Sequence, residues 1–149
     1  MILNTSRFGD VEIEEDKIVS FPEGIPGFSD VKRYIILDHP NGPDVPFKCL
    51  HAVDDADLAF VITDPLLFNC DYNPDIDEQD LKELQITSPE DFGMIVIVTI
   101  PHDEPEKMTA NLQGPILINL GTREAKQVFL VSDDCQIRYP LLQKEAVLR

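Results

Sequence analysis

Apolar residues in this chain fall into short segments rich in Val and Ile, which turn-forming residues separate roughly every 8–12 positions. Such spacing is typical of an all-β sandwich or barrel, in which each strand is brief and leads to the next through a turn. Two segments, FVIT (60–63) and MIVIVTI (94–100), are almost continuously apolar, so we expect both of their faces to be buried. The pattern predicts strands at residues 11–15, 17–21, 33–37, 47–53, 58–63, 94–100, 115–120 and 126–131.

The first two predicted strands are expected to pair as a hairpin. Apolar Val11, Ile13 and Ile18 alternate with charged neighbours, and this period of two is broken at Glu15 and Asp16. A turn at these two residues would join the strands.

One segment, residues 77–85, has helical rather than β character. Asp77 is a favourable N-cap residue, and further acids follow in the first turn, where they suit the helix dipole. Leu81 and Leu84 are three residues apart and therefore share one face. We expect a short helix that packs against the β-structure.

The chain is strongly acidic, with a formal net charge of −16 from 28 acidic and 12 basic residues. This imbalance argues against binding to nucleic-acid phosphates or anionic lipid, because both require a basic surface. It suits a basic protein partner, whose approach an acidic field would accelerate, and it equally suits a surface that serves only solubility. The 149 residues are expected to form one domain (1–149) with a polar tail at about 143–149.

Cysteine usage and the chain's start favour a cytoplasmic protein. The three cysteines include no CxxC pair, so neither a disulfide framework nor a zinc site is predicted. The segment MILNTSRFGD lacks the features of a signal peptide, and the longest apolar run is too short to span a bilayer. No heptad or long apolar patch is visible, so we expect a monomer.

No catalytic or metal-binding motif is convincing. Residues 71–82 place oxygens at alternate positions, as a calcium loop does, but Ile76 replaces the required Gly and Lys82 the bidentate Glu. Cys49 and His51 lie two residues apart on a predicted strand and would share a face, which leaves a small hydrolase as one alternative. We favour a small apolar cysteine with a histidine at the rim. No cofactor or metal is predicted.

Five sequence blocks carry a family resemblance. They are FGDVEIEEDKIVSFPEGIPGF (8–28), LAFVITDP (58–65), MIVIVTIP (94–101), MTANLQGPILIN (108–119) and KQVFL (126–130). In order and spacing they resemble the FliW family of flagellar assembly factors, over residues 5–140. The chain departs from the family pattern at Cys49–Ala52 and at Cys135.

The resemblance implies a compact antiparallel β-barrel-like domain without catalytic activity and with two protein partners. One implied partner is flagellin, held in the cytosol before export. The other is CsrA, a dimeric RNA-binding repressor of flagellin translation. Flagellin would occupy the protein until flagellin is exported. The released protein would then antagonise CsrA. One alternative is a flagellin export chaperone that does not bind CsrA. Another concerns the mechanism: the acidic residues could mimic RNA and compete with it directly, instead of weakening RNA binding indirectly.

Candidate partner-binding residues come from turns and from the acidic segment. Phe28 follows a two-proline loop that requires positive φ at Gly24 or Gly27, and we expect Phe28 to be exposed. Asn111 and Asn119 flank a Gly-Pro pair, where such residues more often satisfy backbone groups. The acidic candidates for steering CsrA are Asp71, Asp75, Asp77 and Asp80.

Overall fold

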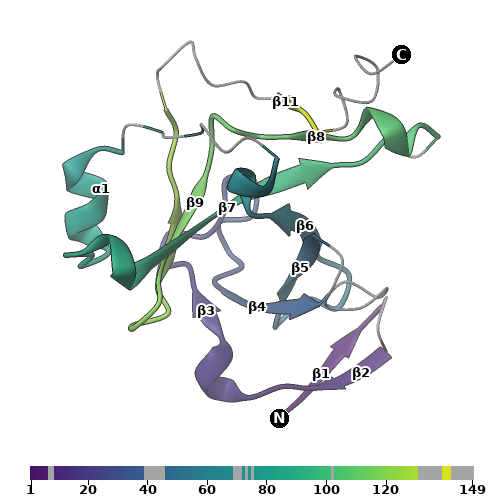
Figure 1. The fold of residues 1–149 in the computed structure, drawn as a ribbon. Coiled ribbons are helices and arrows are strands. Elements are labelled where there is room, and N and C mark those ends of the chain that lie inside the picture. Colours follow the sequence, from purple (N-terminus) through teal and green to yellow (C-terminus); the bar gives the residue numbers. More distant parts are fainter. Residues whose placement is uncertain are drawn as a thin grey trace.

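The computed structural model describes residues 1–6, 9–38, 46–68, 72, 74, 76–101, 103–130 and 139–141 (Figure 1). The strands are β1 (Ile2–Thr5), β2 (Gly9–Glu12), β3 (Val19–Ser20), β4 (Arg33–Asp38), β5 (Phe47–Ala52), β6 (Ala59–Thr63), β7 (Phe92–Thr99), β8 (Thr109–Ala110), β9 (Ile116–Asn119), β10 (Ala125–Gln127) and β11 (Tyr139–Pro140). The helices are α1 (Glu78–Glu83) and the 3-10 turns η1 (Glu15–Lys17), η2 (Pro65–Leu67), η3 (Pro89–Asp91) and η4 (Pro105–Lys107). None of the described helices is long and apolar enough to cross a membrane.

The long strand β7 joins two parts of one antiparallel sheet, whose order is β10-β9-β7-β6-β5-β4-β3. Phe92 to Ile95 pair with β9, whereas the second half of β7 pairs with β6 and β8. Figure 1 shows β7 running diagonally from the side of α1 toward β8 and β11. The strand therefore carries hydrogen bonds to three neighbours along its length.

The sheet curves until its edge strands meet. Ser20 of β3 forms a parallel bridge with Glu124, and its N–H donates to the Arg123 carbonyl at 2.8 Å. This contact is a single bridge rather than a continuous ladder, so the fold is barrel-like without being a closed barrel. The expected mainly β, antiparallel architecture with one short helix is confirmed.

The main core lies inside this curved sheet and receives a side chain from most of its strands. Its buried members are Val19, Phe21, Ile25, Tyr34, Leu50, Ala52, Ile62, Ile116, Ile118 and Ala125. On the opposite face, Val96 and Val98 of β7 are buried in a second cluster. Ile95 and Ile97 pack against the main core, so β7 contributes to cores on both faces, as its apolar run predicts.

Tyr34 has a phenolic hydroxyl that is buried and has no hydrogen-bond partner among the described residues. Its ring packs edge-on against Phe21, with the centroids 5.1 Å apart. Burial raises the pKa of Tyr34 to about 12, and Asp55 adds to the shift. The neutral form is therefore strongly preferred in the folded state.

We expect Tyr34→Phe to leave the fold intact and to raise the free energy of unfolding by about 1 kcal/mol, because an unsatisfied buried hydroxyl is removed. A raised pKa means that the wild type keeps its full stability below the ordinary tyrosine value of 10.0 and loses stability as the pH rises toward about 12. Urea unfolding at pH 7 and pH 11 should show a larger advantage for the variant at pH 11. An equal advantage at both values would contradict this account.

The predicted hairpin between residues 11–15 and 17–21 is wrong. β2 pairs instead with β1, which the sequence did not predict, and β3 pairs with β4. Residues 15–17 form η1, in which the Ile18 N–H donates to the Glu15 carbonyl. The alternating residue Ile13 joins Leu3 and Ile35 in a separate cluster, so this apolar face covers the outside of β4 rather than extending the sheet.

The remaining predicted strands are present, with shifted ends. The strand predicted at 126–131 ends at Gln127, although the N–H groups of Val128 and Leu130 still donate to the carbonyls of Pro115 and Gln113. The short strands β8 and β11 were not predicted, because two residues carry no periodicity.

Candidate protein-binding site

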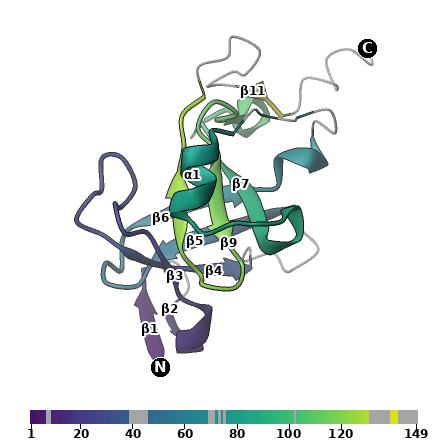
Figure 2. The ribbon, with the colours of Figure 1, turned by 90° about the vertical axis from the view of Figure 1, so that its left-hand side faces the viewer.

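The helix α1 forms where the sequence predicts it. The Asp77 side chain caps the helix by accepting a hydrogen bond from the Gln79 N–H at 2.8 Å. Leu84 is buried with Leu117 and Val128, and Leu81 packs against them. These contacts fix α1 on the outer face of β9, as seen in Figure 2.

The exposed residues of α1 and its cap are mostly acidic, with Lys82 as the one base of the helix, and a lysine from β10 is held against the carboxylates. Lys126 Nζ donates to Asp80 Oδ1 at 2.7 Å and to Glu83 Oε1 at 2.6 Å. Asp77 and Glu78 are exposed and make no ion pair with any described residue. The helix therefore presents carboxylates that remain available to a partner.

The Lys126 bridge also shifts two pKa values. Hydrogen bonds to Asp80 and Glu83 raise the pKa of Lys126, and the bond from Lys126 lowers the pKa of Glu83. The bridge is therefore fully stabilising between the ordinary values of 4.5 for Glu and 10.5 for Lys. Its contribution is lost as the pH falls through the lowered pKa of Glu83 or rises through the raised pKa of Lys126.

We expect Lys126→Met to lower the free energy of unfolding by about 1 kcal/mol at pH 7, because two carboxylates then face each other without their shared cation. Urea unfolding across pH should show this difference shrinking in acid and in strong alkali. Lys107→Met is the matched control, because its pair with Glu104 is exposed on both sides and an exposed pair contributes little. Equal losses in the two variants would contradict a special role for Lys126.

A groove lies between the start of α1 and the chain that follows β10. We call it the α1 groove; its volume is about 460 Å³, and it is lined by Ile76, Asp77, Glu78, Asp80, Val128, Phe129 and Leu130. Phe129 is 62% exposed, whereas its neighbours Val128 and Leu130 are buried. Asp80 is held by Lys126. An exposed aromatic beside the exposed carboxylates of Asp77 and Glu78 is nevertheless a suitable surface for a protein segment that is both apolar and basic.

Asn119 links the end of α1 to the turn between β9 and β10 through side-chain hydrogen bonds. Its side-chain N–H donates to the Leu84 carbonyl at 2.7 Å, at the end of α1. Its oxygen accepts from the N–H groups of Gly121 and Thr122, in the turn between β9 and β10. The residue is 5% exposed, so it positions α1 and the turn relative to each other.

Known proteins resemble this chain in both sequence and architecture. The family model described as "FliW protein" matches residues 2–141. The chain belongs to the FliW family. A flagellar assembly factor FliW from Thermoanaerobacter pseudethanolicus is 44% identical over 144 residues, covering 97% of this chain and 95% of that protein. One from Alkaliphilus metalliredigens is 41% identical, covering 97% and 88%.

A solved FliW structure has the same fold. The crystal structure of the flagellar assembly factor FliW superposes with a TM-score of 0.85 at 37% identity, covering 95% of this chain and 96% of that chain. The resemblance of the five sequence blocks to the FliW family is thus confirmed over nearly the whole chain.

The other predicted site residues of this FliW-family chain are dispersed. Phe28 is 41% exposed, as expected, and its ring contacts Phe60 edge-on with the centroids 5.5 Å apart. Asn111 is half-buried, and its oxygen accepts from the N–H groups of Gln113 and Gly114. Neither residue lines the α1 groove. Asp71 and Asp75 lie outside the described residues.

Cys49 and His51 share one face of β5, as predicted, but His51 is not at a rim. His51 is 1% exposed and Cys49 is 5% exposed. The imidazole Nδ1 lies 2.7 Å from the Ala52 carbonyl oxygen. Ile35 of β4, which pairs with His51 across the sheet, is buried with Leu3 and Ile13, so His51 lies beside an apolar cluster rather than at an edge. In the described part of the chain, no group of three or more His, Cys, Asp or Glu residues is arranged to hold a metal.

Sequence reasoning missed Phe129 and Lys126 as members of the site. Phe129 was assigned to the predicted strand 126–131, within the apolar run 128–131, where an aromatic suggests packing rather than exposure. Lys126 lies 46 residues from Asp80 in sequence, so no local spacing signals their contact. Phe129 is exposed in the chain after β10, which ends at Gln127, and this early end of the strand is visible only in the folded structure.

Proposed function

We propose that this FliW-family protein is a non-enzymatic cytoplasmic regulator that binds a CsrA-type dimer through the α1 groove and is itself sequestered by flagellin. In this scheme flagellin occupies the protein until it is exported, and the released protein then antagonises CsrA and relieves repression of flagellin translation. The observation that carries the proposal is the combination, along one groove, of exposed Phe129 with the exposed carboxylates of Asp77 and Glu78.

Charge supports the choice of a CsrA-type partner. An RNA-binding protein presents basic residues to phosphates, so it is attracted by a chain with a net charge of −16. Long-range attraction accelerates encounter, whereas a buried aromatic anchor prolongs the bound state. The α1 groove offers both kinds of contact at one place.

The first test is calorimetric titration of the protein with the CsrA homologue of the same organism, alone and with flagellin already bound. Without flagellin, we expect about one molecule of this protein to bind each protomer of the CsrA homologue. With flagellin present, we expect this binding to be lost. Binding of flagellin without any binding of CsrA would select an export chaperone instead. The absence of binding to both CsrA and flagellin would overturn the proposal.

The acidic contribution can be isolated with Asp77→Asn together with Glu78→Gln. Asn remains a good N-cap and the Lys126 bridge is untouched, so the helix should persist. We expect association with the CsrA homologue to slow about three- to tenfold at low salt and less at physiological salt, because two steering charges are lost. Stopped-flow fluorescence measures the rate.

The matched control is Asp103→Asn together with Glu106→Gln. It changes the net charge by the same amount near η4, on the far side of the molecule from α1 (Figure 1). Equal slowing by the two double variants would mean that only total charge matters, which would contradict a role for the α1 groove.

Direct mimicry of RNA makes a different prediction. If the carboxylates compete for the RNA surface of the CsrA homologue, saturating RNA should displace this protein completely. Indirect inhibition instead permits a ternary complex at high RNA, which analytical ultracentrifugation with labelled RNA would detect. A hydrolase role for Cys49 or His51 would require activity that is lost on their substitution by Ala.

A further inference from the structure

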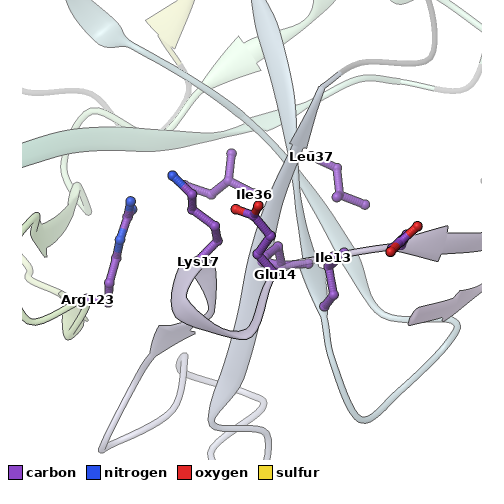
Figure 3. Close-up of a pocket in the computed structure, with 8 residues that line it drawn as sticks. Ile13, Glu14, Lys17, Ile36, Leu37 and Arg123 are labelled. Atoms are coloured by element: carbon purple, nitrogen blue, oxygen red, sulfur yellow. The ribbon is translucent and has the colours of Figure 1, made fainter. Parts of the chain in front are cut away.

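A second pocket lies on another part of the surface, between η1, β4 and the turn that joins β9 to β10 (Figure 3). We call it the edge pocket; its volume is about 530 Å³. Ile13, Ile36 and Leu37 supply apolar walls. Because no residue of the α1 groove lines it, the edge pocket is a separate surface.

The edge pocket contains an unpaired part of a sheet edge. β3 pairs with β4 only at Arg33 and Tyr34, because the chain before β3 turns away into η1. The Val53 N–H donates to the Arg33 carbonyl, so the backbone groups of residue 33 and of every second residue after it face β5. The N–H and C=O of Ile36 consequently face the other edge, where no described strand pairs with them.

Two cations from different elements reach one end of this pocket. Figure 3 shows Lys17 from η1 and Arg123 from the β9–β10 turn extending to the same end, with Ile13 and Leu37 at the other. Neither cation forms an ion pair with a described residue. Arg123 has a φ of +64°, a backbone conformation that residues with a Cβ rarely adopt.

We propose that the edge pocket binds an extended segment of a partner protein, which adds a strand beside Ile36 and places an apolar side chain and one carboxylate in the pocket. Main-chain hydrogen bonds to an open edge give affinity, and side-chain pockets give specificity. The apolar side chain packs beside Ile13 and Leu37, which share one face of the sheet, and the carboxylate meets Lys17 and Arg123.

Charge restricts the segment to a single well-placed carboxylate. Glu12 and Glu14 also line the pocket, so a segment that is acidic throughout would be repelled. A basic segment would gain nothing at the Lys17–Arg123 end. This selectivity is the opposite of that expected at the α1 groove, so the two surfaces take chemically different partners and the inference does not depend on the proposed function.

The probe is the peptide acetyl-Thr-Leu-Thr-Glu-Thr-amide, in which Leu and Glu are two residues apart and therefore point to the same side of an added strand. Two control peptides replace Glu by Gln or by Lys. Two-dimensional NMR of the ¹⁵N-labelled protein, titrated with peptide to millimolar concentration, should show saturable shifts of the Lys17, Ile36, Leu37 and Arg123 amides. Hydrogen exchange of the Ile36 amide should slow in the presence of the peptide.

We expect the Gln peptide to bind about fivefold more weakly than the Glu peptide and the Lys peptide more weakly still. Arg123→Gly removes the guanidinium while suiting the positive φ, so thermal melting should show an intact fold together with a comparable loss of peptide binding. Glu14→Gln should strengthen binding of the Glu peptide, because a repelling charge is removed.

Three results would overturn the inference. The first is the absence of saturable shifts in the edge pocket. The second is equal binding of the Glu and Lys peptides, which would indicate an apolar contact alone. The third is a set of shifts at Ile36 and Leu37 that depends on protein concentration without peptide, which would show that the edge pairs with a second copy of this chain.

Discussion

Gly24→Ala is expected to lower the free energy of unfolding by at least about 3 kcal/mol, the largest effect of any small substitution in the 21–31 loop. Gly24 has a φ of +70°, and a Cβ at this position would lie 2.5 Å from the Ser29 Cα. Backbone atoms cannot yield as a flexible side chain can. The loop would have to open, which would disturb the burial of Phe21 and Ile25 on either side.

Gly27→Ala separates this steric clash from backbone strain. Gly27 also has a positive φ, +90°, but an added Cβ there would meet nothing within 4 Å. We expect its cost to be about 1 kcal/mol, from conformation alone. Chemical unfolding of the two variants measures the difference, and equal costs would show that the approach of Ser29 to Gly24 is easily relieved.

Asn119→Ala is expected to cost about 3 kcal/mol, because one substitution removes a buried hydrogen bond to the end of α1 and two part-buried bonds to the β9–β10 turn. The Leu84 carbonyl loses its donor, and the Gly121 and Thr122 N–H groups lose their acceptor. The end of α1 and the β9–β10 turn should loosen together. Hydrogen exchange should therefore accelerate in both segments, and binding at the α1 groove should weaken.

Asn111→Ala is the matched control for Asn119→Ala. The oxygen of Asn111 also accepts two part-buried backbone hydrogen bonds, which water can replace, but Asn111 has no counterpart of the buried bond from Asn119 to the Leu84 carbonyl. We expect a cost of about 1 kcal/mol and no change in exchange at α1. A larger loss in Asn111→Ala than in Asn119→Ala would show that the link between helix and turn is not the important contact.

The elements predicted correctly are those whose signals are local. The helix was found because its cap, its acidic first turn and its two leucines all lie within a few residues of Asp77. The central strands were found because apolar runs of five to eight residues, roughly the usual strand length, stand between turns. The two-proline loop predicted positive φ at Gly24 or Gly27, and both residues have it.

The errors arose where pairing depends on distant residues. Alternation at Val11 and Ile13 correctly indicated a strand, but it does not specify the partner, and Leu3 proved to be the neighbour rather than residues 17–21. His51 appeared suited to a rim because nothing local indicates that Leu3 and Ile13 pack against Ile35, the strand partner of His51. In both cases a non-local apolar contact outweighed the local pattern.

A mainly β chain with one capped helix and a strongly acidic charge could be predicted from the sequence, because periodicity, capping and composition act over short distances. The FliW family was recognised separately, from the resemblance of five sequence blocks. Which charges meet depends on long-range packing and follows only from the folded structure. This packing brought Lys126 to Asp80 and Glu83, set Lys17 near Arg123 beside the open edge of β4, and exposed Phe129 next to α1. Burial of the apolar faces fixes the curvature and register of the sheet, and these polar neighbours follow from that packing.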